Sequence, residues 1–290
     1  MVTSVADAAG VVAVIDPGPG QDMSVQGRVL EYIRTHRRNR LVRKVASFSR
    51  AVHLAFENSS YDPATNGEEF LLRVLAAERP LVVFDVGANV GDWAKAARRH
   101  LSSATVHCFE IVRATRDALT RNVADDTQIV VSACGLSDVA GEVPVRFYPS
   151  NIEISSVVDY PHDREFIVER CPVTTGDSYV AANHIERIDL LKVDTEGAEG
   201  LVLDGFIGAF DAGRVRVVQF EYGYANIVSR RLLRDHYAFL EARDYRVGKL
   251  YPDYVDFRAY DLKGEDFIGP NYVAVHASDV ELLHRLQHPR

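Results

Sequence analysis

After residue 80, the chain alternates short, almost wholly apolar runs with amphipathic stretches whose apolar positions recur at helical spacing. The first pattern predicts strands that are buried on both faces, and the second predicts surface helices. Strands and helices in alternation are typical of a mostly parallel sheet that helices cover on both sides. We therefore predict an α/β fold with a seven-stranded sheet. The expected strands are 81–86, 105–109, 128–134, 188–194, 215–222, 245–251 and 272–275, and the expected helices are 92–101, 113–122, 197–203 and 229–242.

The first 65 residues follow a different pattern. Residues 1–23 are small, punctuated by glycine and proline and without periodicity, so we expect them to be disordered. Residues 24–65 form a predicted helical extension, with one or two helices that reach about Phe56. The main domain, 66–290, then begins with a helix at 68–77.

The helical extension is strongly basic. Residues 24–50 contain eight lysine and arginine residues against a single acid, Glu31, which is a local charge of +7 in a chain whose net charge is −8. Such a segment is a solvated helix face, a face docked on the acidic remainder of the same protein, or a surface for an anionic substrate or partner. An apolar stripe on the same helices also predicts a homo-oligomer that forms through them.

The overall composition argues against several classes of protein. The net charge of −8 and an isoelectric point near 5.7 disfavour nucleic acid as the main partner. No apolar run approaches the roughly 20 residues that cross a bilayer. The early apolar run at 10–16 is short and has no basic residue before it, so we expect a cytoplasmic protein. Cys108, Cys134 and Cys171 have neither disulfide nor zinc-site spacing, and we expect no metal.

Polar residues follow the first predicted strand, where open α/β sheets bind their ligands. Gly87 permits a sharp turn after the strand, and Gly91 permits the next helix to pack close to it. A dinucleotide loop would read G-x-G-x-x-G, with a diphosphate on the helix N-terminus. Here Asn89 replaces the middle glycine, and Asp85 would repel a diphosphate. Asp85 can instead hold the ammonium of a methionine moiety, directly or through water, which favours the sulfonium cofactor of methyl transfer.

The next two strand ends predict a nucleoside pocket. Glu110 ends the second strand, and a carboxylate at this place can accept both hydroxyls of an adenosine ribose. The ribose of NAD would satisfy Glu110 equally well. Ser137 and Asp138 follow the third strand, where either could bind the amino group of adenine.

Acidic residues gather at the fourth and fifth strand ends. Asp194 and Glu196 are two residues apart, and in extended geometry they would share a face of the chain. Glu221 ends the next strand and is followed by Tyr222. Three carboxylates that converge on one cleft predict general-base chemistry, with a divalent ion as the less favoured alternative.

Six segments together resemble the FkbM family of S-adenosylmethionine-dependent methyltransferases. They are "NGEEFLL", "VFDVGANVG", "FE", "GLSD", "TTGDSY" and "DLLKVDTEGAE", and the resemblance covers roughly 66–222. It implies a Rossmann-like class I methyltransferase fold, S-adenosylmethionine as cofactor and S-adenosylhomocysteine as product. It also implies O-methylation of a hydroxyl on a sugar-containing, glycoconjugate or secondary-metabolite acceptor. Five residues match its cofactor positions: Glu68, near the methionine end, Gly87, Asn89, Glu110 and Asp194.

The chain departs from this family in two loops. Ile111 stands where many members have proline, and Gly176 stands where many have leucine. Both are loop changes that leave the cofactor assignment intact. The resemblance does not cover the basic N-terminal segment, whose purpose stays open.

Methyl transfer to a hydroxyl requires a base that takes the hydroxyl proton as the new bond forms. Our first candidate is Glu196, followed by Asp194 and Glu221, and Asp194 ranks lower because it is expected to face the cofactor. An insertion is expected at about 141–175, and its first residues, 141–148, are predicted to form an extra hairpin strand. His162 lies in this insertion and could serve as a base on a substrate loop.

The acceptor side of the pocket is expected to come from that insertion and from the C-terminal part of the chain. The segment at about 252–270 is predicted to be a lid or a closing β-hairpin. Four residues are candidates for substrate contact: Tyr148, Ser155, Ser156 and Tyr222.

Three other functions compete with methyl transfer to a small molecule. An NAD(P)-dependent sugar-nucleotide oxidoreductase or epimerase would use a Y-x-x-x-K pair, which Tyr245 and Lys249 match, but that pair needs a helix and this run is expected to be a strand. A non-catalytic cofactor-binding protein would not need the clustered acids. Nucleic-acid methylation has only the basic N-terminal segment in its favour.

Overall fold

The computed structural model describes residues 24–77, 81–149, 155–158 and 164–288. The chain forms two compact units, Met1–His53 and Leu54–Arg290, and each is described by itself. The expected disorder of residues 1–23 falls outside the described residues. Within the described part of the chain, no helix is long and apolar enough to cross a membrane.

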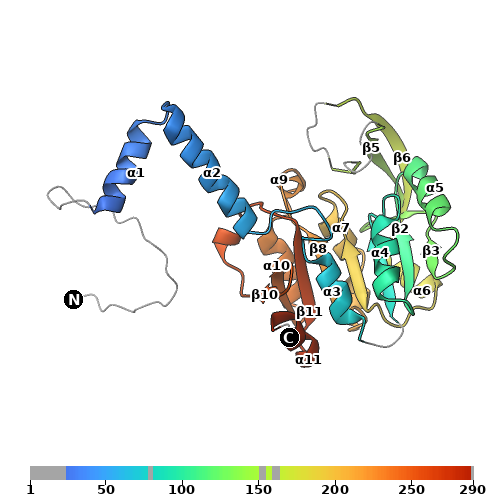
Figure 1. Ribbon diagram of the computed structural model, residues 1–290. Coiled ribbons are helices and arrows are strands. Elements are labelled where there is room, and N and C mark those ends of the chain that lie inside the picture. Colours follow the sequence, from blue (N-terminus) through green and yellow to red (C-terminus); the bar gives the residue numbers. More distant parts are fainter. Residues whose placement is uncertain (1–23, 78–80, 150–154, 159–163, 289–290) are drawn as a thin grey trace. The chain divides into compact units, whose positions relative to one another are not determined.

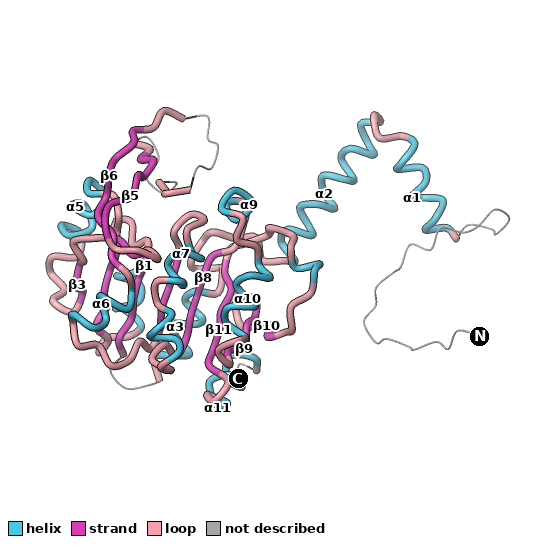
Figure 2. The backbone as a smooth tube through the Cα atoms, turned by 180° about the vertical axis from the view of Figure 1, so that it is seen from behind, coloured by secondary structure: helices cyan, strands magenta, loops and turns pink. Residues whose placement is uncertain are grey.

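The unit Leu54–Arg290 is built on an eight-stranded sheet in the order β10-β9-β11-β8-β7-β1-β2-β3 (Figures 1 and 2). The strands from β8 to β3 run parallel, and β11 lies antiparallel between β8 and β9. All seven predicted strands are present, which confirms the mostly parallel Rossmann-like sheet, and β10 adds a short strand at one edge. The strands are β1 (Val82–Val86), β2 (Thr105–Phe109), β3 (Ile129–Val131), β7 (Leu190–Val193), β8 (Val217–Glu221), β9 (Tyr245–Leu250), β10 (Val255–Phe257) and β11 (Asn271–His276).

Helices cover both faces of this sheet and enclose two apolar cores. In β1, Val83 belongs to one core and Phe84 to the other, because successive side chains of a strand point to opposite faces. The core around Val83 also takes residues from α3, α4, α5 and α11, and the core around Phe84 from α6, α7, α8 and α10. These helices are α3 (Glu68–Leu75), α4 (Asp92–His100), α5 (Arg113–Asn122), α6 (Gly176–Ala182), α7 (Glu199–Asp204), α8 (Ile207–Asp211), α10 (Leu233–Glu241) and α11 (Val280–Gln287).

The helix predicted at 229–242 corresponds to α10, which begins only at Leu233. A separate helix, α9 (Ala225–Ser229), precedes it and ends at Arg230, which has a left-handed φ of +59°. Such a backbone angle cannot continue a helix. The sequence pattern did not predict α6, α8, α9 and α11, which are short.

A second, small sheet has the order β4-β6-β5 and projects beyond one end of the main sheet (Figures 1 and 2). β4 (Gly135–Leu136) pairs in parallel with β6 (Ile167–Thr174), and β6 pairs antiparallel with β5 (Gly141–Phe147). β5 matches the strand expected at the start of the insertion. β6 was not predicted, although it lies within the same insertion.

The unit Met1–His53 contains α1 (Val25–Thr35) and most of α2 (Arg40–Phe56), which confirms the helices predicted up to Phe56. Ser24 Oγ accepts a hydrogen bond from the amide of Gly27 at 3.1 Å and so caps the start of α1. α1 buries none of its residues, and α2 buries only Val42.

Candidate functional site

Four parallel strands end in register at one edge of the main sheet. Val86 pairs with Phe109 on one side and with Val193 on the other, and Val193 pairs with Phe220. A pocket of about 470 Å³ lies at this edge, a size that suits a small-molecule ligand. The residues that directly follow the four paired positions all line it: Gly87, Glu110, Asp194 and Glu221.

The loop after β1 is held against the end of β7. Gly87 has a φ of +83°, and a Cβ atom at this position would lie 1.7 Å from the backbone oxygen of Asp194. Only glycine fits there. Asn89 has a φ of +46°, and its side-chain Oδ1 is buried without a hydrogen-bond partner within the described residues. Gly91 lies outside the pocket wall and packs on Leu119 of α5, which corrects our expectation of a packing contact with the strand.

Glu110 lies in the wall beside this loop with its carboxylate largely buried. Its Oε2 accepts a hydrogen bond from the amide of Asn89 at 3.0 Å, and its Oε1 accepts one from the amide of Val112 at 2.9 Å. Burial raises the pKa of Glu110 to about 7, although both amide hydrogen bonds act in the opposite direction. Each carboxylate oxygen keeps a lone pair for a further donor, such as a ribose hydroxyl.

The residues proposed for the adenine edge are only partly in the wall. Ser137 is buried and lines the pocket, and its hydroxyl donates to Asp138 Oδ1 at 3.0 Å. Asp138 itself is exposed and is not a lining residue, which contradicts a direct contact.

Asp85 does not reach the pocket, which corrects the direct contact that we considered for it. Its side chain is completely buried, and its Oδ1 accepts a hydrogen bond from Lys192 Nζ at 3.1 Å. Lys192 does line the pocket, and its Nζ also lies 3.2 Å from Asp194 Oδ2 and 5.3 Å from the centre of the Trp93 ring. Burial lowers the pKa of Lys192, but the carboxylates of Asp85 and Asp194 outweigh it and leave the pKa above its ordinary value. Lys192 is therefore a fixed cation in the wall.

Glu68 lies near enough to this cation to raise the pKa of Lys192. Its Oε2 accepts from Asn66 Nδ2 at 3.0 Å, and its Oε1 accepts from Gln219 Nε2 at 2.6 Å. Gln219 Nε2 also donates to Asn271 Oδ1 at 3.2 Å. Glu68, Asn66 and Asn271 line the pocket. Glu68 thus lies in the pocket wall, its contact with the methionine end of a cofactor stays a prediction, and its amide partners were not foreseen.

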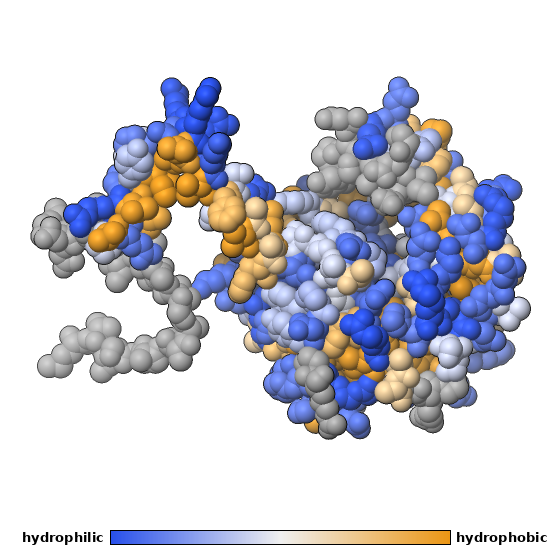
Figure 3. All heavy atoms as spheres, viewed as in Figure 1, coloured by the Kyte–Doolittle hydropathy of each residue, from blue (hydrophilic) through white to orange (hydrophobic). Residues whose placement is uncertain are grey.

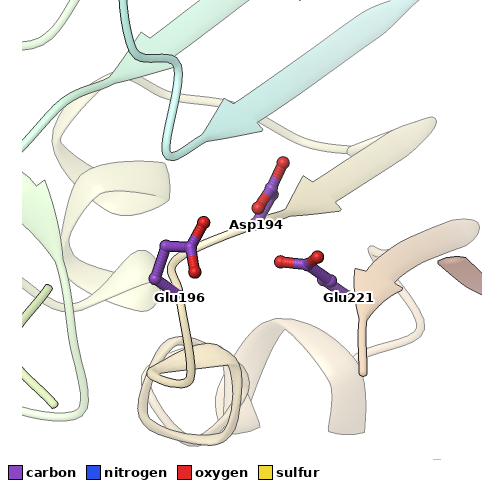
Figure 4. A group of neighbouring side chains, drawn as sticks. All are labelled: Asp194, Glu196 and Glu221. Atoms are coloured by element: carbon purple, nitrogen blue, oxygen red, sulfur yellow. The ribbon is translucent and has the colours of Figure 1, made fainter. Parts of the chain in front are cut away.

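Asp194, Glu196 and Glu221 meet at one point of the wall, as expected. One carboxylate oxygen of each lies within 4.8 Å of those of the other two. Figure 4 shows the three carboxylates turned toward a shared space, Asp194 and Glu196 from the loop after β7 and Glu221 from β8. Burial raises the pKa of Glu221 well above its ordinary value, and the charges of Asp194 and Glu196 raise it further. Ionisation of Glu221 is therefore disfavoured while its two acidic neighbours are charged.

The turn that carries Glu196 is not the extended chain that we expected. Glu196 has a left-handed φ of +55°, and Gly197 follows with a φ of +98°. Glu199 stabilises this turn, because its buried Oε1 accepts from the amide of Thr195 at 2.9 Å and from the amide of Gly197 at 3.1 Å. On the opposite side, the hydroxyl of Ser156 donates to the backbone oxygen of Glu196 at 2.9 Å.

The four residues proposed for substrate contact divide into two groups. Ser155 and Ser156 line the pocket. Tyr148 and Tyr222 are buried and are not lining residues, which contradicts their assignment. The Tyr222 hydroxyl donates to Glu265 Oε2 at 2.5 Å, so its role is structural. His162 lies outside the described residues.

Tyr61 is a lining residue that our sequence analysis missed. It lies in the turn-rich segment before α3, where a single aromatic side chain among small polar residues was the available signal. Burial raises the pKa of Tyr61 to about 12, with a further contribution from Glu221 and Glu196, so its phenol stays protonated next to the acidic cluster.

The pair expected for an oxidoreductase is not formed. Tyr245 and Lys249 lie on strand β9, not on a helix. The Tyr245 hydroxyl donates to the backbone oxygen of Val215, and Lys249 Nζ donates to the backbone oxygen of Ile268 at 3.1 Å. Neither residue lines the pocket.

Known proteins resemble the central part of this chain. Methyltransferase sdnD of Sordaria araneosa is 31% identical over 43% of this chain and 60% of its own length. The hexuronic acid methyltransferase AglP of Haloferax volcanii is 29% identical over 54% of this chain and 64% of its own. The 31-O-demethyl-FK506 methyltransferase FkbM of Streptomyces tacrolimicus is 30% identical over 48% of this chain and 64% of its own. The chain thus spans less than two thirds of each of these relatives.

A family model described as the methyltransferase FkbM domain matches residues 85–247, more than half of the chain. The matched region includes the glycine loop, Glu110 and all three clustered acids, and it lies on a Rossmann-like sheet. The chain therefore belongs to the FkbM methyltransferase family.

Proposed function

We propose that the protein is an S-adenosylmethionine-dependent O-methyltransferase that acts on a hydroxyl of a sugar-containing, glycoconjugate or secondary-metabolite acceptor. The observation that carries this proposal is the register of four strand ends, which puts Glu110 and the acidic cluster on the wall of one pocket. Two relatives support the acceptor class by their names, one as a hexuronic acid methyltransferase and one as a 31-O-demethyl-FK506 methyltransferase.

The wall offers groups that fit each part of the cofactor. Glu110 would accept the ribose hydroxyls, and the buried Oδ1 of Asn89 lacks a partner that a ligand donor can supply. Ser137 would meet the adenine. The methionine part carries both an ammonium and a carboxylate, and the wall holds the cation Lys192 together with the carboxylates of Asp194 and Glu68, both of which raise the pKa of Lys192. This mixed charge suits a zwitterion better than it suits the diphosphate of NAD.

The bound cofactor would supply an electrophilic methyl group, and the protein must align the acceptor oxygen and take its proton. We assign the base to Glu196, with Asp194 and Glu221 as alternatives. Glu221 has a raised pKa, which disfavours its ionised form, and Asp194 is paired with Lys192. Glu196 is tied by its backbone to Ser156, on the side of the pocket that the insertion forms.

The same three acids have the ligand type of a divalent ion, but Lys192 argues against one. Its ammonium lies 3.2 Å from Asp194 Oδ2 and would repel a second cation from that carboxylate. We therefore expect methyl transfer to persist in the presence of a chelator. Loss of turnover in EDTA and its recovery on adding Mg²⁺ would show that the three carboxylates bind a metal ion and do not act as the base.

Transfer of label from methyl-labelled S-adenosylmethionine into a fractionated extract of the source organism tests the proposal. The Glu110→Ala variant is the blank. Label in a glycoconjugate or small-molecule fraction is the expected result. Label in RNA or protein would overturn the acceptor class, and absence of label from every fraction would contradict methyl transfer to a component of that extract.

A further inference from the structure

Helices α1 and α2 carry an apolar stripe that is open to solvent. Its members recur at intervals of three and four residues, which places them on one side of each helix. Their exposed fractions lie between 51% and 75%. The stripe consists of Val25, Val29 and Tyr32 on α1 and of Leu41, Val45, Phe48, Val52 and Phe56 on α2.

The remaining surface of the same helices is cationic. Of the eight basic residues between 24 and 50, only Arg34 forms an ion pair within the described part of the chain, at 3.6 Å with Glu31. In Figure 3, apolar atoms gather on one side of this helix pair and hydrophilic atoms on the other. The exposed basic residues are Arg28, Arg34, Arg37, Arg38, Arg40, Arg43, Lys44 and Arg50.

These helices need a partner surface to be stable. α1 has 11 residues and α2 has 17, and isolated helices of this length are marginal in water. Burial of an apolar face normally provides the missing stability, yet only Val42 is buried in the two helices. The partner must therefore accept apolar side chains and a local charge of +7 together.

The surface of an anionic bilayer meets both requirements. An interfacial helix sinks its apolar face about 5–10 Å into the boundary between headgroups and acyl chains, and its lysine and arginine side chains reach the phosphates. Nucleic acid would pair with the arginines but leave Phe48 and Phe56 in water. A second copy joined along the stripe would bring two segments of charge +7 together, which is repulsive.

We propose that residues 24–56 form a membrane-surface module that docks the protein on anionic phospholipid, with Phe48 and its stripe at the acyl boundary and the arginines at the headgroups. The proposal concerns attachment in the plane of the membrane surface, not a span across it. It does not depend on the reaction that the unit Leu54–Arg290 catalyses.

The test is co-sedimentation of the full chain with vesicles of phosphatidylcholine alone and of phosphatidylcholine mixed with phosphatidylglycerol. We expect binding to the mixed vesicles only, and weaker binding at high salt because salt screens the headgroup charge. Circular dichroism should show more helix on addition of the mixed vesicles. Equal binding to both compositions, or to neither, would overturn the proposal.

Variants separate the stripe from the charge. Phe48→Ser combined with Val52→Ser should weaken vesicle binding at least about tenfold, because two apolar side chains stay in water. Arg43→Gln combined with Arg50→Gln should weaken vesicle binding roughly 30-fold, which corresponds to a loss of about 1 kcal/mol of headgroup attraction for each arginine. The matched control is Leu262→Ser, a side chain with 75% exposure outside the helix pair, which should bind as the parent does.

Two readouts keep the result interpretable. Thermal unfolding of each variant should match that of the parent, because none of the changed side chains is buried. Light scattering without lipid reports the oligomeric state. A dimer that the Phe48→Ser and Val52→Ser changes dissociate, together with no vesicle binding by the parent, would show that a second copy covers the stripe.

Discussion

At the scale of single residues, Glu110 is the most informative side chain of the pocket. Its carboxylate accepts one backbone amide on each oxygen, so its orientation is set before a ligand arrives. Burial nevertheless raises its pKa to about 7, which places its titration in the physiological range. A ribose diol that donates to the carboxylate stabilises the ionised form alone.

This titration predicts a pH-dependent affinity for S-adenosylhomocysteine. Ligand binding to the ionised form must release a proton below pH 7, so the affinity should fall as the pH drops through about 7 and level off above it. Calorimetric titrations between pH 5.5 and 8.5 measure it. The Glu110→Gln variant keeps every other titrating group and should lose this dependence. A parent whose affinity is flat over the same range would contradict the ribose assignment.

Glu196 is the residue whose change should separate chemistry from binding. Glu196→Gln removes the proposed base but keeps the side-chain volume, so turnover should fall by about 10²- to 10⁴-fold while the affinity for S-adenosylhomocysteine changes little. Initial rates with the identified acceptor and calorimetry measure the two quantities. The exposed Glu186→Gln serves as control. Turnover equal to that of the parent would transfer the role to Glu221 or His162.

At the scale of elements, the site depends on how closely the loop after β1 approaches β7. Gly87 has no room for a side chain, since its Cβ would lie 1.7 Å from the Asp194 oxygen. Gly213 also has a left-handed φ, +65°, but nothing lies within 4 Å of its Cβ position. Both glycines therefore have a left-handed backbone conformation, but only Gly87 also lies in close contact with a neighbouring strand end.

Substitution of these two glycines should separate the two effects. Gly213→Ala should cost about 1 kcal/mol of the free energy of unfolding, the price of a left-handed alanine. Gly87→Ala should cost more than about 3 kcal/mol, because the strand ends must also move apart. Urea unfolding measures both. Equal losses in the two variants would mean that the loop does not need its close approach to β7.

Local sequence patterns predicted an element well where one apolar pattern runs through the whole element. β2 and α5 begin and end at the expected residues, and the four strand ends that line the pocket carry the acids and glycine foreseen there. What failed depends on long-range contacts. Nothing in the sequence shows that Lys192 pairs with Asp85, 107 residues away, or that Tyr222 turns toward Glu265. The break at Arg230 rests on a backbone angle that arginine rarely adopts.

At the scale of the whole molecule, the chain combines a family domain with a part that the family model does not match. Residues 85–247 match the FkbM domain, whereas the two basic helices lie outside it. The acids and glycine of the pocket follow from the shared fold, and we expect acceptor choice to depend on the insertion around β5 and β6. The charge of +7 on residues 24–50 leaves −15 for the rest, so the two parts should interact differently with an anionic surface.

A calorimetric titration of the full chain with S-adenosylhomocysteine tests most directly whether the pocket binds S-adenosylmethionine. NAD⁺ is the comparison ligand. The pocket we describe predicts binding of S-adenosylhomocysteine by the parent and a loss of at least about 100-fold in Glu110→Ala, which removes two charge-assisted hydrogen bonds. NAD⁺ should give no heat. Binding of NAD⁺ in place of S-adenosylhomocysteine, or equal affinities of the parent and Glu110→Ala, would contradict the assignment of this pocket to S-adenosylmethionine.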